Sequence, residues 1–362
     1  MSFEPLNLWF KEKARQLPWR LPRQDTEQAV PDPWAVLVSE IMLQQTQVAT
    51  VLPYFKKWMA RFPTYHDLAQ AQEDEVMKLW EGLGYYRRAK GLQKAAQYLV
   101  QIQGFPKTRE ELLKIPGVGP YTSAALLAFA FHQKSVPVDG NVLRVASRWL
   151  GSDKDIAKAS TAKYFEEVLT DHLPKADPWI TSEALIELGA TLCKPKNPSC
   201  QQCPLKSSCN AYAQNLQDKL PVKTKLQAVE KLWHTVAVIY HPQQEMQWLA
   251  CQRTSSGLFQ GLWHFPYIAR ETEAAELSYE SLRLRHFLGL EVQLIQPLKK
   301  QKHTFTRFSA HLLPLYMRVH SRSGLATQEG WQYQWLDINS LKNLTFCSGH
   351  RQIRDELCQG QP

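Results

Sequence analysis

The chain has 362 residues, enough for two ordinary domains and a substantial buried core. Hydrophobic residues make up 44% of it and no apolar run is long enough to cross a bilayer, so the composition is that of a soluble globular protein and excludes a membrane protein. The net charge of +9 favours a polyanionic partner, although a basic protein without such a partner would carry the same charge.

The first informative segment in chain order is an apolar helix with a glutamate on its edge. Apolar residues between positions 34 and 41 recur at the spacing of one helix face, which predicts a core-facing stripe. Glu40 and Gln44 fall together on the edge of that stripe, where a carboxyl group is partly removed from water. An ordinary surface glutamate is the alternative interpretation of Glu40.

The residues that follow Glu40 suit contact with nucleic-acid bases. Leu43 points away from the apolar stripe and stands beside Gln44, Gln45 and Gln47. An exposed leucine among glutamines is unusual on a solvated face. Apolar side chains can, however, separate base steps, and glutamine can hydrogen-bond base edges. The pattern therefore indicates a DNA wedge.

A second candidate contact segment runs from Gly82 to Lys90. It combines two aromatic residues with three cations, namely Tyr85, Tyr86, Arg87, Arg88 and Lys90. Such a segment offers stacking faces beside partners for phosphate. A core-packing role for one of the two tyrosines is the alternative.

The sequence from Leu112 to Ala125 predicts a helix, a tight turn and a second helix. Gly117 and Gly119 permit a turn whose backbone N–H groups point outward, and the following helix adds its dipole. The turn therefore suits a phosphate oxygen and would hold DNA without reading its sequence. An ordinary helix–helix turn is the alternative.

Asp139 follows Gly119 by twenty residues and precedes a predicted helix from Asn141 to Trp149. Its carboxylate can cap that helix, which is a purely structural role. Because it lies just beyond the hairpin that would hold phosphate, it can equally face the sugar. There it would stabilise positive charge at the anomeric carbon.

Four of the seven cysteines lie within seventeen residues, at Cys193, Cys200, Cys203 and Cys209. In a reducing compartment such clustering indicates metal ligation rather than disulfides. Four thiolates suit either Zn²⁺ or an iron–sulfur cluster, and only Cys200 and Cys203 have the short spacing of a zinc knuckle. The loop also carries lysines that would face phosphate if the metal ordered it.

The residues from Gln214 to Lys231 are polar and rich in lysine, and they predict an interdomain linker. The pattern before the linker is helical, whereas β-branched and aromatic runs after it predict strands at Trp233–Tyr240, Met246–Gln252 and Phe308–Val319. Eight of the eleven histidines lie in this later part.

The remaining cysteines are scattered, and we interpret them as structural: Cys251, Cys347 and Cys358.

Together, the hairpin Ile115–Gly119, Asp139 and the four-cysteine loop resemble the endonuclease III superfamily. Within it, Ser39–Val48 and Val138–Val142 are similar to the adenine DNA glycosylase (MutY) branch. The resemblance implies a mostly α fold in three parts. These are a helix-hairpin-helix glycosylase domain at 1–213 with an iron–sulfur loop at 193–209, a linker at 214–231, and an α+β Nudix-like lesion-recognition domain at 232–362.

The resemblance also implies roles for single residues. Glu40 would be the acid, and Asp139 the stabiliser of the sugar cation or a transient nucleophile. Asn141 falls at the active-site asparagine of the family. Tyr121 stands where bifunctional lyases carry a Schiff-base lysine, so a monofunctional DNA N-glycosylase is expected. A [4Fe-4S] cluster is implied on the four cysteines, and the positions around the lesion base are Leu43, Gln44, Gln45, Thr46 and Tyr85.

The C-terminal part resembles the family's Nudix-like module that reads 8-oxoguanine, with Gly261–Pro266 among its markers. The Glu-rich signature of active Nudix hydrolases is missing after Pro266, so metal-dependent pyrophosphate hydrolysis is not expected. In the loop that would contact the lesion, Thr306 keeps a hydroxyl, but Arg307 stands in place of the family's histidine.

The expected partner is double-stranded DNA with an A·8-oxoguanine or A·G mispair. A location in the cytoplasm is expected, because no export signal is recognisable. A monomer is also expected. The sequence names no protein partner. The first alternative is another glycosylase of the superfamily, acting on oxidised pyrimidines or on thymine in T·G mispairs. The second is a non-catalytic iron–sulfur protein that binds DNA.

Overall fold

The computed structural model describes residues 2–20, 31–224, 228–242, 246–255, 259–305 and 307–360. Its internal contacts divide the chain into two units. The first unit runs to Ala71 and resumes from Lys90 to Leu226, and the second combines Gln72–Ala89 with Gln227–Pro362, so the boundary falls inside the predicted linker. Among the described residues, no helix is long and apolar enough to span a membrane.

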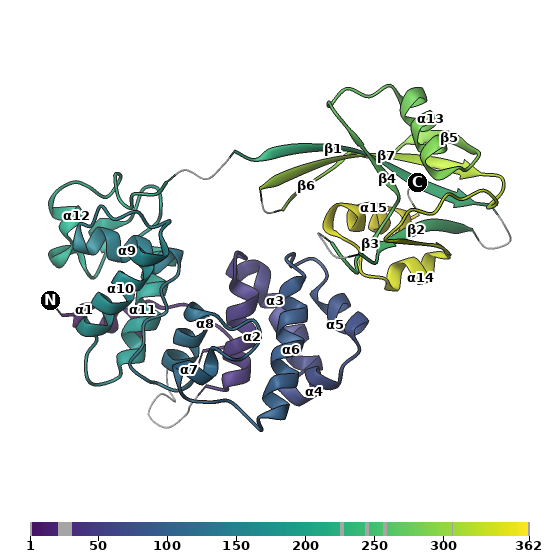
Figure 1. The fold of residues 1–362 in the computed structure, drawn as a ribbon. Helices are drawn as coiled ribbons and strands as arrows, with labels where there is room; N and C mark the ends of the chain where they lie inside the picture. Colours follow the sequence, from purple (N-terminus) through teal and green to yellow (C-terminus); the bar gives the residue numbers. More distant parts are fainter. Residues whose placement is uncertain are drawn as a thin grey trace. The chain divides into compact units, whose positions relative to one another are not determined.

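The first unit is helical (Figure 1). Its helices are α1 (Glu4–Lys13), α2 (Pro33–Leu43), α3 (Val48–Arg61), α4 (Tyr65–Gln70), α6 (Arg87–Gln101, whose first turn belongs to the other unit), α7 (Arg109–Leu112), α8 (Pro120–Ala125), the π-helical turn η1 (Leu126–Ala130), α9 (Gly140–Leu150), α10 (Ala159–His172), α11 (Pro178–Thr191), the 3₁₀ turns η2 (Cys200–Gln202) and η3 (Lys206–Ser208), and α12 (Asn210–Ala213).

The second unit is an α+β domain, as the sequence predicts. Its elements are α5 (Glu73–Trp80), β1 (Glu230–His241), β2 (Gln247–Arg253), β3 (Trp263–His264), β4 (Tyr267–Arg270), α13 (Leu277–Leu288), β5 (Val292–Pro297), β6 (Gln301–Phe305), β7 (Phe308–Val319), β8 (Trp331–Leu336), α14 (Ile338–Asn343) and α15 (Ser348–Cys358). β1, β2 and β7 cover the three runs predicted as strands.

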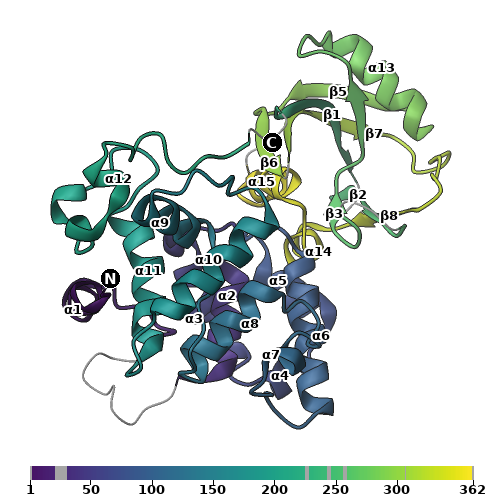
Figure 2. The same cartoon turned by 60° about the vertical axis from the view of Figure 1, so that its left-hand side comes forward.

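The described strands form one mixed sheet in the order β3-β2-β1-β7-β5, with β4 paired to β1, β6 to β7 and β8 to β2. β1 and β7 are parallel, with Trp233 opposite His311. Because side chains alternate across a strand, the sheet has two apolar faces. Val236 and Val238 pack with Ile353 of α15, whereas Ala237 packs with Leu284 of α13, so helices cover both faces (Figure 2).

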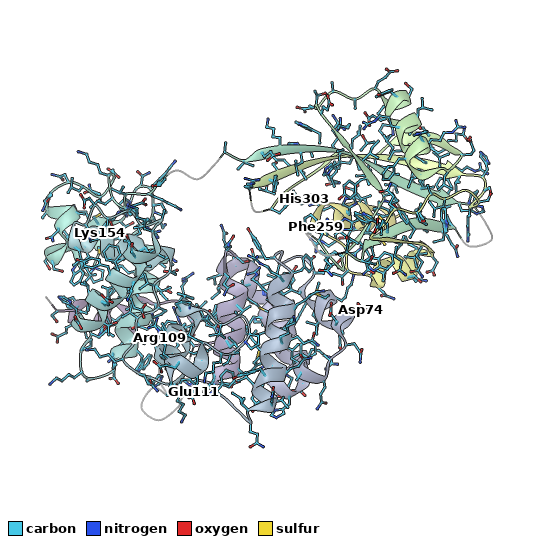
Figure 3. All side chains as sticks on the ribbon, in the orientation of Figure 1. Asp74, Arg109, Glu111, Lys154, Phe259 and His303 are labelled. Atoms are coloured by element: carbon cyan, nitrogen blue, oxygen red, sulfur yellow. The ribbon has the colours of Figure 1, made fainter. Side chains whose placement is uncertain are left out.

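The segment Gln72–Ala89 differs from the expected domain division, because it packs with the second unit. α5, marked by Asp74 in Figure 3, precedes Glu81, whose carboxylate receives Arg354 Nη1 at 2.7 Å and the Phe346 amide at 2.8 Å. Lys78 donates to the same carboxylate at 2.8 Å. Arg354 and Phe346 lie more than 250 positions from Glu81, so local sequence spacing does not show their pairing with it.

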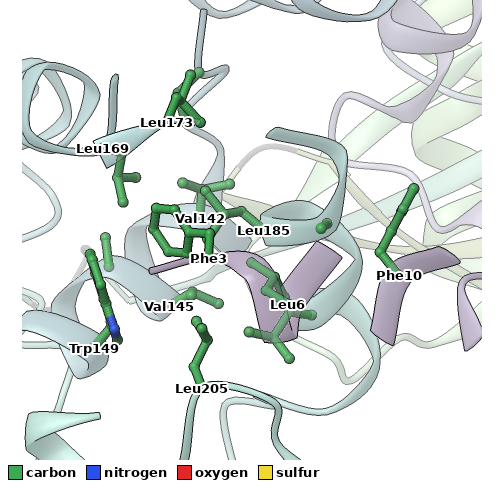
Figure 4. Packing of buried hydrophobic residues seen from close by; sticks show 14 of the residues in the cluster. Phe3, Leu6, Phe10, Val142, Val145, Trp149, Leu169, Leu173, Leu185 and Leu205 are labelled. Carbon is green, nitrogen blue, oxygen red and sulfur yellow. The ribbon is translucent and has the colours of Figure 1, made fainter. Parts of the chain in front are cut away.

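The core of the first unit gathers around α9, between α1 and α11 (Figure 4). Val142, Val145 and Trp149 recur at three- and four-residue spacing and are buried against Leu6 of α1 and Leu185 of α11. This packing fixes the first turn of α9, which carries Asp139 as its cap.

α2 begins where Asp32 accepts the amide of Trp34 and Pro33 occupies the first turn, as expected for a helix start. The predicted apolar stripe is buried. The helix ends at Leu43, earlier than the helical wheel assumes, because Gln45 adopts a left-handed φ of 58°. Gln44 is therefore the C-cap, and Leu43 is half-buried rather than exposed.

Candidate active site

Glu40 and Tyr121 meet at the centre of the first unit. α2 carries Glu40 and α8 carries Tyr121, whose hydroxyl donates to Glu40 Oε2 at 2.7 Å. Glu40 is only 7% exposed, so its carboxyl group is more completely removed from water than its place on the edge of the apolar stripe predicts.

Burial raises the pKa of Glu40 from 4.5 to about 7. The hydrogen bond from Tyr121 opposes this shift because it favours the ionised carboxylate, while the negative charges of Asp139 and Glu183 add to it. A carboxyl group with such a pKa is present in both protonation states near neutral pH, as a general acid requires.

Asp139 caps α9, as the structural interpretation predicts, and it also faces the same site. Its Oδ1 accepts the amides of Asn141 at 2.9 Å and Val142 at 2.8 Å, and its Oδ2 accepts Asn141 Nδ2 at 2.8 Å. Burial raises the pKa of Asp139, but these donors oppose the shift. The capping and the site-facing interpretations are therefore compatible.

Asn141 is held from behind by a residue that the sequence analysis did not single out. Arg144 Nη2 donates to Asn141 Oδ1 at 2.9 Å and to the carbonyl of Gly189 at 2.8 Å. A Cβ atom at Gly189 would lie 2.6 Å from the Cβ of Asn141, so only glycine lets α11 approach α9 this closely.

Four further charged residues escaped the sequence analysis. Arg20 contacts Glu183 and Glu187, each at 3.0 Å, and Arg15 Nε donates to Glu187 at 2.7 Å. Burial raises the pKa of Glu183, whereas the two arginines outweigh burial and hold the pKa of Glu187 below its usual value. Glu183 and Glu187 are four residues apart on α11, but no local pattern pairs them with the N-terminal arginines.

The carboxylates of Glu40 and Asp139 line one cavity of about 1040 Å³. It brings together most of the predicted site residues of the first unit, namely Glu40, Leu43, Gln44, Gln45, Thr46, Gly117, Gly119, Tyr121, Asp139 and Asn141. Its lining thus includes both glycines of the hairpin turn.

The hairpin turn lies between α7 and α8, as predicted. Gly117 has a φ of 81°, a conformation that glycine adopts without strain, and the amide of Val118 closes the turn on the carbonyl of Ile115 at 3.0 Å. Gly119 caps α8, which Pro120 begins.

All four clustered cysteines are free thiols that line a second, smaller cavity in the first unit. Burial raises the pKa of Cys203 to about 12, and the charges of the neighbouring cysteines add to the shift. Arg148 binds this loop, since its Nη1 lies 3.4 Å from Cys193 Sγ and donates to the carbonyl of Lys194 at 2.7 Å. Four converging thiols beside a cation suit a bound metal group.

The spacing of the sulfur atoms bears on which metal group would fit. Among the described residues, no three of these sulfurs lie within 4.8 Å of one another. Four sulfurs around one zinc ion, at Zn–S distances of about 2.3 Å, would stand roughly 3.8 Å apart. In every set of three, at least one pair of these sulfurs is therefore farther apart than in a single zinc site.

Two predicted DNA-contact segments belong to the second unit. Tyr85 is half-buried with a φ of 48°, and Tyr86 is buried in the core. Arg88 is buried and donates to the carbonyls of Leu83 and Gly84, each at 3.1 Å, so the prediction that it faces phosphate is wrong. Its neighbour Arg87 is exposed.

In the predicted lesion loop, Arg307 is exposed, and its guanidinium lies 5.1 Å from the Phe308 ring centroid. Thr306 lies outside the described residues.

Comparison with known proteins extends these observations. Residues 38–171 match the family model of the HhH-GPD superfamily of base excision DNA repair proteins, and residues 235–356 match that of the NUDIX domain. The structure is similar to that of a thermostable thymine-DNA glycosylase, with a TM-score of 0.50 and 26% identity, covering 58% of this chain and 94% of that one. The predicted two-part fold class is confirmed.

Curated relatives match along most of the chain. The adenine DNA glycosylase of Homo sapiens is 34% identical over 346 residues, covering 82% of this chain and 63% of the human protein. The chain thus spans less than two thirds of that relative's length. The adenine DNA glycosylase of Buchnera aphidicola subsp. Baizongia pistaciae is 30% identical over 342 residues, covering 92% of this chain and 90% of that protein. With this match over about nine tenths of both proteins, the chain belongs to the adenine DNA glycosylase family.

Proposed function

We propose that this protein is a base-excision repair enzyme that hydrolyses the N-glycosidic bond of adenine mispaired with 8-oxoguanine or guanine in DNA. The observation that carries the proposal is the pair of carboxyl groups in one cavity, Glu40 and Asp139, held in different environments. The family supports the same activity.

Glu40 supplies the proton that adenine needs before it can leave. Adenine is a poor leaving group until a ring nitrogen is protonated, and a carboxyl group with a pKa of about 7 still carries a proton near neutrality. Because Tyr121 donates to Oε2, the other carboxyl oxygen is left to hold that proton.

Asp139 supplies the negative charge that the sugar needs once the base departs. The leaving base creates an oxocarbenium-like sugar, which an ionised carboxylate stabilises across space or by a transient bond. The two amides and the Asn141 side chain that donate to Asp139 keep this anion oriented. Tyr121 stands in place of a Schiff-base lysine, which supports a monofunctional glycosylase.

The wall of the cavity supports roles in holding extrahelical adenine. Base flipping needs a side chain that fills the vacated stack and polar groups that hold the base. Leu43 suits the first need, and the adjacent Gln44, Gln45 and Thr46 suit the second. The turn at Gly117 and Gly119 would hold phosphate through its backbone amides.

The second unit would read the base opposite adenine. Tyr85 offers a stacking face, while Thr306 and Arg307 belong to the loop that the family resemblance places beside the lesion. We propose that the chain is divided by function into a glycosylase domain at 1–213, a linker at 214–231 and a lesion-recognition domain at 232–362. The segment Gln72–Ala89 nevertheless packs with the lesion-recognition domain. We also propose that the protein acts as a monomer.

We further propose a [4Fe-4S] cluster on Cys193, Cys200, Cys203 and Cys209. Their free thiols line one cavity, and in every set of three at least one pair of sulfurs is farther apart than around a single zinc ion. When bound, the cluster would order the loop that carries Lys194, Lys196 and Lys206 for contact with DNA phosphate. Protein purified without oxygen should show broad visible absorption and contain iron, and zinc in place of iron would contradict this assignment.

Single-turnover cleavage of duplexes with A·8-oxoguanine, A·G or T·G pairs tests the activity. Release of adenine from the first two and no release of thymine from the third is expected. Thymine release would instead favour the activity named for the similar thymine-DNA glycosylase. No base release from any duplex would leave a non-catalytic DNA-binding protein.

Glu40→Gln and Asp139→Asn test the two roles, because each keeps the side-chain shape and removes the ionisable group. Both variants should lose base release by at least 10²-fold, on the order of a lost acid–base catalyst, while duplex binding persists. A near-wild-type rate in either variant would refute the role of that residue.

A further inference from the structure

A second group of potential metal ligands lies in the C-terminal unit, far in sequence from the cysteine loop. His264, Cys347 and His350 are all buried, with residue exposures of 2%, 1% and 3%. One ligand atom from each lies within 4.8 Å of the other two. These residues account for part of the histidine-rich composition of this unit, which the glycosylase reaction does not use.

The three side chains are in direct contact. Cys347 Sγ and His264 Nδ1 are 3.2 Å apart, and the rings of His264 and His350 have centroids 5.1 Å apart. His264 Nε2 is buried without a hydrogen-bond partner among the described residues. Within the trio, only this nitrogen is buried and without a partner among the described residues, and a buried polar group of that kind calls for a ligand or another explanation.

We propose that His264, Cys347 and His350 form a binding site for a zinc ion, separate from the four-cysteine loop.

The local fold explains how the site is built. Cys347 and His350 are three residues apart, and they flank the start of α15 at Ser348. Cys347 is the N-cap of α15. His264 comes from the neighbouring β3, and the bridge from Trp263 to Phe346 holds the two segments together.

The donor set selects the class of metal. One thiolate and two imidazoles suit Zn²⁺, whereas Mg²⁺ and Ca²⁺ prefer oxygen ligands. The site is therefore unlike the carboxylate-bound metal of an active Nudix hydrolase, whose Glu-rich signature this chain lacks.

His303 packs so closely against position 349 that only glycine fits there. A Cβ atom at Gly349 would lie 2.3 Å from His303 Nδ1, so the His303 ring lies directly against this turn. Both ring nitrogens of His303 lack a hydrogen-bond partner among the described residues. His303, labelled near Phe259 in Figure 3, is thus a further imidazole available next to the site.

Metal binding changes two hydrogen bonds. The Cys347 thiol would lose its proton to solvent as the sulfur binds the ion, and its 3.2 Å contact with His264 Nδ1 would change. The Phe265 amide donates to His350 Nδ1 at 3.1 Å, so a metal bound by the His350 ring changes the surroundings of this amide. The Phe265 amide therefore reports on loading.

The test uses the full chain, expressed with zinc, and compares it with Cys347→Ser. Elemental analysis should find one more zinc ion per chain in the wild type than in Cys347→Ser. Cys358→Ser is the matched control, since it removes another α15 cysteine outside the trio and should keep the wild-type zinc content. Equal zinc contents in all three proteins would overturn the proposal.

A second measurement needs no variant and so does not depend on whether Cys347→Ser folds. In cadmium-loaded wild-type protein, ¹¹³Cd NMR should show a resonance of a one-sulfur, two-nitrogen site, distinct from any four-sulfur site. The Phe265 amide resonance should shift on loading. Absence of that cadmium resonance would overturn the proposal. Neither outcome bears on adenine release, because the inference does not rest on the proposed function.

Discussion

At the residue scale, the hydroxyl of Tyr121 has two opposite effects on Glu40. It occupies one carboxylate oxygen, which orients the group, and it lowers the pKa that burial raises. The Tyr121 hydroxyl thus influences both the direction in which Glu40 delivers its proton and the pH range in which Glu40 carries it.

The pH dependence of base release follows from this balance. Glu40 acts in its protonated form, so the single-turnover rate should fall as pH rises through about 7. Tyr121→Phe removes a hydrogen bond that favours the ionised form, which raises the pKa of Glu40 further. The fall in rate should therefore move to higher pH in this variant, as measured by pH–rate profiles of both proteins. A move to lower pH would contradict the assignment.

Gly189 gives a second prediction at this scale. Gly189→Ala places a methyl group against Asn141, so Asn141 and the carboxylate it holds must shift. A displacement of about 1 Å in a catalytic group lowers rates on the order of 10²-fold. Single-turnover rates should show this loss with a smaller loss of stability, of about 1–3 kcal/mol for overpacking.

Gly91→Ala in α6 is the matched control for Gly189→Ala. A Cβ atom there meets no atom within 4 Å, and alanine favours a helix interior. It should leave the rate unchanged. An equal loss of rate in both variants would show that the close approach of α11 to α9 does not position Asn141.

At the element scale, local patterns predicted the helices and strands, but not where distant partners meet. The apolar stripe of α2, the hairpin turn and the cap of α9 follow from short-range spacing and were predicted. The early end of α2 depends on the left-handed backbone of Gln45. Arg88 is buried because its guanidinium donates to a carbonyl of its own loop. The pairing of Arg20 with Glu183 joins elements far apart, which periodicity does not encode.

The contact between α5 and α15 yields a stability prediction. Arg354→Met leaves the buried Glu81 carboxylate without its guanidinium partner, although Lys78 still donates to it. The expected loss in the free energy of unfolding is about 3 kcal/mol, the lower end of the range for a broken buried pair. Chemical denaturation measures it, and adding Glu81→Gln should cost less than the sum of the two single changes.

The exposed pair of Arg285 and Glu291 is the matched control, with side-chain exposures of 42% and 77%. Arg285→Met should cost at most about 1 kcal/mol, as surface ion pairs do. Equal losses for Arg354→Met and Arg285→Met would contradict the structural role of the buried pair.

At the scale of the whole molecule, the segment Gln72–Ala89, from the N-terminal half of the chain, packs against and hydrogen-bonds C-terminal residues. Besides the Glu81 contacts, Tyr86 donates to the carbonyl of Phe346 at 3.2 Å, and Lys78 donates to that of Leu344 at 2.9 Å. Tyr85 lies in this same segment, so a candidate DNA contact depends on residues more than 250 positions later.

Truncation tests this dependence. In a chain that ends at residue 224, the segment Gln72–Ala89 loses these partners, and its amides should exchange with solvent faster than in the full chain. Amides of α9 should keep their protection, because its core partners remain. Hydrogen exchange measures both, and unchanged protection of Gln72–Ala89 would show that the segment folds without the C-terminal unit.

α9 also sets the spacing between the proposed catalytic aspartate and the cysteine loop. Asp139 stands at its start, while Arg144 and Arg148, further along, hold the carbonyl of Cys193 and the loop behind it. Arg144 and Arg148 lie five and nine residues after Asp139, which places them roughly 8 and 14 Å from it along the helix axis. Insertion of a single residue would turn one end against the other by about 100°, so the length of α9 is constrained to the residue.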